Sequence, residues 1–87
     1  MQYEFNEDKN ELLKSARNIC FEDIIEVIEL NGVIDDLKNK NFSQQRILVV
    51  RIREYIYAVP YVIKSPAIIF LKTIYPSRKL HKKYENK

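Results

Sequence analysis

The stretch that decides the fold lies in the last third of the chain and reads Ile68-Ile69-Phe70-Leu71-Lys72-Thr73-Ile74-Tyr75-Pro76-Ser77-Arg78-Lys79. Its first four residues form a continuous apolar run, which is typical of a buried strand. Cations follow at once, and Ser77 is suited to cap a helix that begins after it. The pattern predicts a buried strand that leads directly into a short, positively charged helix.

Charge is divided unevenly along the chain. Residues 72–87 contain five Lys and one Arg against the single acid Glu85, whereas residues 1–40 contain ten acids and five cations. A small domain with this asymmetry presents a basic surface that attracts polyanions. We therefore expect the functional residues at the basic end.

Length and composition favour a single domain that spans residues 1–87. A hydrophobic content of 46% with one glycine indicates a packed core. The single cysteine, Cys20, excludes an internal disulfide, and no run of about 18 apolar residues is present to span a bilayer. The first residues lack the features of a signal peptide, so we expect a cytoplasmic protein without membrane association.

Two helices are expected in the first third of the chain. Asn6 is a favoured cap for a helix over Glu7–Arg17, and Asn18 readily takes the left-handed conformation that ends helices. Apolar residues at helical spacing, opposite an acidic face, predict a second helix before Asn31-Gly32: Phe21, Ile24, Ile25 and Ile28.

Alternating apolar and polar residues then predict strands over Val33–Lys38, Arg46–Arg53, Tyr55–Ile63 and Ala67–Tyr75. Pro60 cannot donate a hydrogen bond to a neighbouring strand, so its strand is expected at an edge or with a bulge. The apolar run of the last strand predicts that this strand is central and most deeply buried.

Short connections between these strands imply an antiparallel sheet. The expected fold class is α+β, with two N-terminal helices packed on one face of a three- to four-stranded antiparallel sheet and a short C-terminal helix at the end. The opposite face of the sheet is left for a partner or a substrate.

Three blocks carry a resemblance to a known family: Tyr3-Glu4-Phe5-Asn6-Glu7-Asp8-Lys9-Asn10, Arg17-Asn18-Ile19-Cys20-Phe21-Glu22-Asp23 and Lys72-Thr73-Ile74-Tyr75-Pro76-Ser77-Arg78-Lys79. In this order they resemble the BrnT-type toxins of bacterial type II toxin-antitoxin pairs, which share the RelE/ParE-like fold and are metal-independent ribonucleases. The resemblance implies cleavage of RNA without a cofactor, and a hetero-oligomer with a cognate antitoxin protein. The chain departs from the family where Asn18 and Cys20 replace a Gly and a Ser or Thr, and Cys is a poor helix cap.

Cleavage of RNA without a metal requires a base near the attacking 2′-hydroxyl, cations near the developing phosphorane charge and an acid at the leaving oxygen. Arginine grips a phosphate with two donors, lysine supplies a point charge, and histidine ordinarily changes charge near neutral pH. Together with the resemblance, this chemistry predicts the catalytic residues Lys72, Arg78, Lys79, His81 and Tyr84.

Further basic and aromatic residues are predicted to bind RNA by phosphate contact or base stacking: Arg51, Arg53, Tyr57, Lys82 and Lys83. Each also has a structural interpretation. Tyr57 suits packing under a helix, Arg51 and Arg53 suit protection of an edge strand, and Lys82 and Lys83 suit a solvated helix end.

Two classes of function remain after these observations. The first is a toxin endoribonuclease that a cognate antitoxin neutralises. The alternative is a non-catalytic, toxin-like module that binds nucleic acid or an acidic protein partner through its basic face. No phosphate-binding glycine loop, metalloprotease motif or nucleophile elbow supports another enzyme class.

Overall fold

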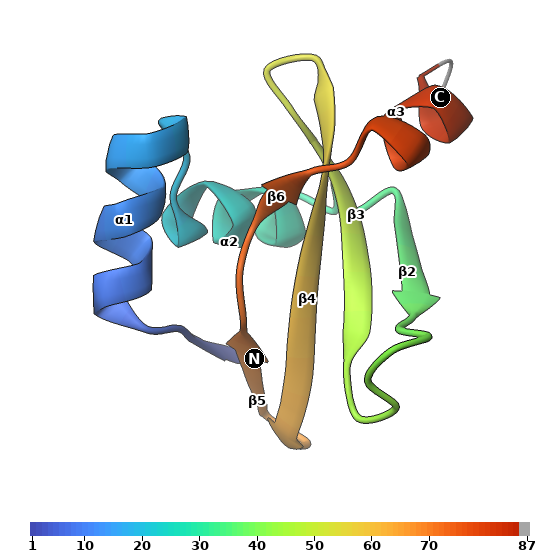
Figure 1. Cartoon of the computed structure of the whole chain (residues 1–87). Helices are drawn as coiled ribbons and strands as arrows, with labels where there is room; N and C mark the ends of the chain where they lie inside the picture. The colour runs from blue at the N-terminus through green and yellow to red at the C-terminus, as the bar shows by residue number, and fades with distance from the viewer. Residues whose placement is uncertain (86–87) are drawn as a thin grey trace.

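A computed structural model describes residues 1–85, and Lys87, the last cation of the charged segment, lies outside them. Within residues 1–85 the chain forms three helices and a six-stranded sheet (Figure 1). In chain order these elements are β1 (Gln2–Glu4), α1 (Glu7–Arg17), α2 (Phe21–Glu29), β2 (Asp35–Lys38), β3 (Arg46–Ile52), β4 (Tyr55–Ser65), β5 (Ile68–Leu71), β6 (Tyr75–Pro76) and α3 (Arg78–Tyr84). The α+β class and the order of the helices are as expected from the sequence.

The predicted ends of the first helix are confirmed. The Asn6 side chain accepts a hydrogen bond from the Lys9 backbone amide at 2.9 Å, and Asn18 closes α1 in the left-handed region with φ of 54°. Acids in the first turn and cations in the last turn complement the helix dipole. Local sequence alone therefore fixes α1.

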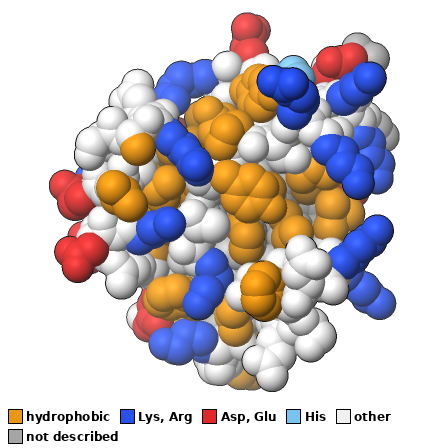
Figure 2. Space-filling model, viewed as in Figure 1, with side chains coloured by type: hydrophobic (Ala, Val, Ile, Leu, Met, Phe, Trp, Pro, Cys, Tyr) orange, Lys and Arg blue, Asp and Glu red, His pale blue; other side chains and the backbone are white. Residues whose placement is uncertain are grey.

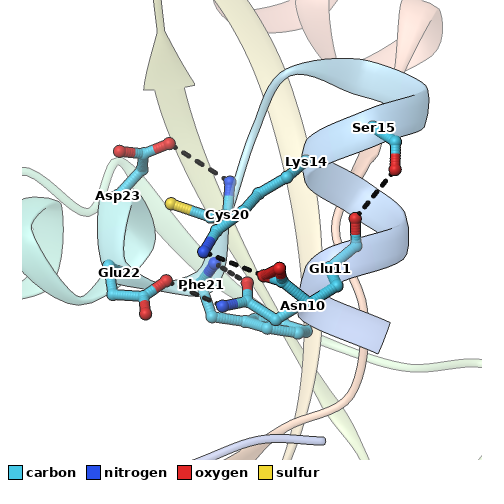
Figure 3. Close-up of polar contacts among 8 residues, drawn as sticks. All are labelled: Asn10, Glu11, Lys14, Ser15, Cys20, Phe21, Glu22 and Asp23. Carbon is cyan, nitrogen blue, oxygen red and sulfur yellow. Dashed lines mark hydrogen bonds and ion pairs between the residues drawn. The ribbon is translucent and has the colours of Figure 1, made fainter. Parts of the chain in front are cut away.

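The junction between α1 and α2 is held by Asn10, whose side chain is only 1% exposed (Figure 3). Its carbonyl oxygen accepts the Phe21 backbone amide at 2.7 Å, and its amide donates to the Glu22 carboxylate at 2.8 Å. The Asp23 carboxylate accepts the backbone amide of Cys20 at 3.2 Å. Cys20 and Asp23 form a capping box, and the Asn10 carbonyl supplies a further acceptor for the amides at the start of α2.

The sheet is larger than predicted and mixed rather than purely antiparallel. Its order is β1-β5-β4-β3-β2, β6 also pairs with β4, and β1 runs parallel to β5. The expectation of three or four strands missed β1 and β6 because strands of three and two residues are too short to show alternation.

The expected edge position of the Pro60 strand is wrong, but the alternative of a bulge there agrees with the pairing, which shifts by one residue between the pair Tyr61–Leu71 and the pair Ala58–Tyr75. The last predicted strand is also not the central one, because β5 lies between β1 and β4. β4 is central, with β3 on one side and β5 and β6 on the other, although Pro60 lies within it and is buried. The Pro60 carbonyl accepts the Lys72 amide at 2.8 Å, so the ring nitrogen faces the same side, where residues 72–74 separate β5 from β6. Lys72 therefore lies opposite Pro60, and the neighbouring chain leaves the ladder where Pro60 has no amide to donate, so Pro60 does not force β4 to the edge.

Side chains on the two faces of the sheet form separate cores. Alternate residues of β3 and β4, including Leu48, Val50 and Val59, pack with Phe21 and Ile24 of α2. On the other face, Val49 of β3 and Ile56 of β4 pack with Tyr84 and partly buried Leu80 of α3. Figure 1 shows α1 and α2 at the left of the view and α3 at the upper right.

The β3–β4 hairpin turns on Arg53 and Glu54, which both have positive φ, 48° and 68°. Two left-handed residues in a two-residue loop match the twist of a hairpin, but the usual sequence is Asn-Gly. The Arg53 guanidinium donates to the Asn18 backbone carbonyl at 2.6 Å and thereby ties this turn to the end of α1. Arg53 is thus part of the turn and not the last residue of the strand, as the alternation suggested.

We expect Asn10→Ala to lower the free energy of unfolding by about 1–3 kcal/mol, because the buried Phe21 amide then loses its acceptor. Ser15→Ala is the matched control, since the exposed Ser15 hydroxyl donates only to the Glu11 carbonyl of the same helix (Figure 3). Urea unfolding followed by circular dichroism measures both values. A change below about 0.5 kcal/mol for Asn10→Ala would contradict its role in joining the helices.

Candidate nucleic-acid interface

The interruption between β5 and β6 determines how the basic segment is presented. Lys72 follows β5 on the face that carries Phe70, and its ammonium lies 5.3 Å from the centre of that ring. Two residues later, Ile74 is fully buried in the core on the face of the sheet that carries α1 and α2. Its carbonyl accepts a 2.7 Å hydrogen bond from the Arg17 guanidinium. Anchors on both sides of Thr73 therefore fix where Lys72 leaves the sheet.

A groove of about 650 Å³ lies beside Lys72, on the face of the sheet that carries α3. Three separated parts of the chain contribute to its lining: residues within the segment 37–47, Pro60, and residues within the segment 72–80. Its apolar lining includes Leu37, Ile47, Pro60 and Leu80, and its lysines are Lys38, Lys40, Lys72 and Lys79. We call it the lysine groove.

The charged side chains that line the lysine groove are all cations. Among residues 1–85, its lining contains four lysines, as named above, and no acid. Figure 2 shows this face with hydrophobic side chains near its centre, Lys and Arg side chains around them, and Asp and Glu toward the margin of the view. A concave apolar surface ringed by cations concentrates the positive potential and suits a flexible polyanion with apolar groups.

Two aromatic side chains line the lysine groove and remain accessible. Phe42 is 59% exposed and Tyr75 is 37% exposed. The loop that carries Phe42 is ordered by its own hydrogen bonds, because Asn39 accepts the Phe42 amide and the Gln45 amide donates to the Phe42 carbonyl. An exposed ring on an ordered loop is available for stacking on an unpaired base.

Of the predicted catalytic residues, the structure brings Lys72 and Lys79 together in the lysine groove. Arg78 is exposed on the first turn of α3 and is not part of the groove lining. The strand-to-helix junction predicted from the sequence therefore supplies two of its three cations to one concave surface.

His81 and Tyr84 have positions that serve the packing of α3. The His81 ring stacks on Tyr55 with 4.1 Å between centroids, and its Nδ1 accepts the Ile56 backbone amide at 3.2 Å. The buried Tyr84 hydroxyl donates to the Asp35 carboxylate, and this hydrogen bond raises the pKa of Tyr84. Neither side chain lines the lysine groove.

The predicted RNA-binding residues are dispersed. The Arg51 guanidinium donates to the Tyr84 carbonyl at the end of α3, and Arg53 donates to the end of α1. Tyr57 packs against the core on the face of the sheet that carries α1 and α2, as its structural interpretation suggested. The two lysines predicted with them, Lys82 and Lys83, are exposed on α3 outside the groove lining.

Sequence reasoning missed the wall of the groove formed by the loop after β2. Lys40 and Phe42 lie in this loop, and both line the groove. A signal was present, because a phenylalanine between lysines and amides is unusual in a solvated loop.

No gathering of three or more His, Cys, Asp or Glu side chains suited to a metal ion occurs within residues 1–85. None of the helices in this part of the chain combines the length and the apolar character needed to cross a bilayer.

Comparison with protein families, with curated proteins and with solved structures finds no match for this chain.

The strand that leads into the Phe42 loop is held by a polar cluster at the edge of the sheet. The Asp36 carboxylate of β2 accepts the Tyr61 hydroxyl at 2.7 Å and the Arg46 guanidinium at 2.9 Å. Burial, together with the hydrogen bond to Asp36, raises the pKa of Tyr61 to about 12. The folded state therefore holds the Tyr61 proton more tightly than the unfolded chain does.

The contribution of Tyr61 to stability should be fully present below its unfolded pKa of about 10 and should be lost as the pH rises through about 12. We expect Tyr61→Phe to be less stable by about 1 kcal/mol near neutral pH, because it lacks the hydrogen bond to Asp36. It should also lose less stability than the wild type between pH 10 and pH 12. Urea unfolding at several pH values tests this, and an equal alkaline loss in both proteins would refute it.

Proposed function

We propose that the lysine groove binds single-stranded RNA, and that the chain is a RelE/ParE-like toxin of the BrnT type that cleaves this RNA and is neutralised by an antitoxin protein. The observation that carries the proposal is the convergence of Lys40, Lys72 and Lys79 on one apolar groove whose described lining contains no acid. The resemblance of the three sequence blocks to BrnT-type toxins supports RNA as the polyanion.

Single-stranded RNA fits this surface better than a duplex. Unpaired bases expose their faces and can stack on Phe42 and Tyr75, whereas paired bases in a helix cannot reach side chains on the wall of a groove. The lysines supply sequence-independent contacts to phosphates. Stacking and phosphate contact together favour an extended strand that lies across the face of the sheet.

The chemistry we propose is attack of a 2′-hydroxyl on the adjacent phosphorus. The bond from O2′ to phosphorus forms and the bond to O5′ breaks, which leaves a 2′,3′-cyclic phosphate and a 5′-hydroxyl. Lys72 and Lys79 stabilise the charge on the phosphorane, and an ammonium group protonates the departing O5′. The described lining holds neither imidazole nor carboxylate, so the proton of the 2′-hydroxyl passes to solvent.

A second candidate is an RNA-binding, toxin-like module that does not cleave. The placement of His81 favours it, because the imidazole that would serve best in proton transfer instead packs on Tyr55 and accepts the Ile56 amide. Binding without cleavage requires only the cations and aromatic rings of the groove.

Purified protein incubated with labelled single-stranded RNA in excess chelator should produce shorter fragments that end in a cyclic phosphate. Lys72→Met and Lys79→Met should each reduce cleavage by about 100-fold, since they remove a cation next to the transition-state charge. Each should also lower the slope of binding affinity against salt by about 1, because one phosphate contact is lost. Methionine keeps the apolar stem of lysine and removes only its charge.

Two variants serve as controls in this assay. Lys14→Met removes a lysine that pairs with Glu11 on α1, at 3.1 Å, and should leave cleavage unchanged. His81→Asn keeps an acceptor for the Ile56 amide and should change cleavage only a few-fold. Intact but retarded RNA would favour the binding module, and wild-type protein that neither shifts nor cleaves RNA would refute both candidates.

Expression of the wild-type chain in a bacterial host should slow growth, and expression of Lys72→Met at the same level should not. Co-expression of the protein encoded by the adjacent gene should restore growth if that protein is the antitoxin. Growth curves with immunoblots for protein level measure both effects. Normal growth with abundant folded wild-type protein would count against toxicity.

A further inference from the structure

A second hollow of about 430 Å³ adjoins the lysine groove on the other side of the Phe42 loop. It is lined by residues 41–45 together with Val62 and Lys72. The two hollows share Asn41, Phe42, Gln45 and Lys72, whereas Ser43, Gln44 and Val62 line the second hollow and not the lysine groove. We call this second hollow the amide hollow.

Three exposed polar side chains of the amide hollow are free to bind a ligand. Within residues 1–85, the side chains of Asn41, Ser43 and Gln44 form no hydrogen bond. The loop that carries them is nevertheless ordered, because Asn39 accepts the backbone amides of Asn41 and Phe42 and its own backbone amide donates to the Gln45 carbonyl. An ordered loop thus presents side-chain amides that the fold itself does not use.

Such amides match the edge of a nucleobase. A carboxamide offers one donor group beside one acceptor, and unpaired RNA bases are recognised through adjacent donors and acceptors on their Watson–Crick and Hoogsteen edges. Val62, which is half-buried, supplies an apolar contact in the same hollow. The described lining contains no carboxylate that would repel the neighbouring phosphates.

Lys72 connects the two hollows. If its ammonium holds the phosphate between two nucleotides, one base lies on the lysine-groove side with Phe42 and Tyr75, and the next base lies in the amide hollow. The first position stacks any base, because every base has an aromatic face, whereas the second is read by hydrogen bonds.

We propose that the amide hollow is a nucleobase-recognition subsite in which Asn41 and Gln44 select one base beside the phosphate held by Lys72. This inference rests on the proposed binding of RNA in the lysine groove. It makes the protein selective for RNA sequence at one of the two nucleotides that flank that phosphate.

The test uses the full chain and a pool of short single-stranded RNAs in which every dinucleotide is represented. Bound RNAs are recovered and sequenced at fixed salt, and cleaved junctions are sequenced if cleavage occurs. The wild type should enrich one base at one position by about 5- to 100-fold, the discrimination expected of a good bidentate base contact. The double variant Asn41→Ala/Gln44→Ala should lose this enrichment and should retain most of its average affinity.

Lys79→Met provides the opposite control, because it should weaken binding to all sequences and should keep the enrichment. Thermal unfolding of each variant establishes that Asn39 still orders the loop. Wild-type protein that binds RNA with no base preference would overturn the subsite and leave the proposed function standing. Enrichment that survives in the folded double variant would also overturn the subsite, and a wild type that binds no RNA would overturn both proposals.

Discussion

The structure depends on how the central strand accommodates Pro60. A proline in the middle of a sheet lacks the amide hydrogen that its neighbour would accept, and this usually limits it to edges and bulges. Here the neighbouring chain leaves the ladder over residues 72–74 and re-enters it at β6. The Lys72 amide still donates to the Pro60 carbonyl, and the one extra residue in the break that follows places Lys72 and Ile74 on opposite faces of the sheet.

That arrangement explains why the backbone of the basic segment is anchored between β5 and α3. Ile74 is fully buried and its carbonyl is bound by Arg17, so the backbone between β5 and β6 is anchored to α1. After β6, the Ser77 hydroxyl accepts the Leu80 amide and begins α3, and Tyr84 at the other end of the helix is buried against the sheet. Lys72 and Lys79 are therefore held on either side of a fixed junction and do not belong to a flexible tail.

Local features of the fold were predictable from the sequence, and features that depend on distant parts of the chain were not. The caps Asn6 and Ser77 and the left-handed Asn18 mark helix ends through their own chemistry, and the structure confirms each of them. The central position of β4 could not be predicted from the sequence. Whether Pro60 confines its strand to an edge depends on how the neighbouring strand pairs with it. The turn at Arg53 and Glu54 was hidden for a similar reason, since its left-handed residues carry no glycine signal and Arg53 contacts a distant carbonyl.

The candidate site shows the same division. Lys72 and Lys79 were predicted because a strand that runs into a helix orients its junction residues, whereas Lys40 and Phe42 reach the groove only through the pairing of β2 with β3. His81 and Tyr84 were chosen for their reactivity, and the fold uses their polar atoms to fasten α3 instead. The protein consequently concentrates cations and aromatic rings on one surface and keeps its only imidazole away from it. Under the proposed function, the strength of RNA binding and the stabilisation of phosphorane charge would depend on the same lysines, so removing either lysine should weaken both together.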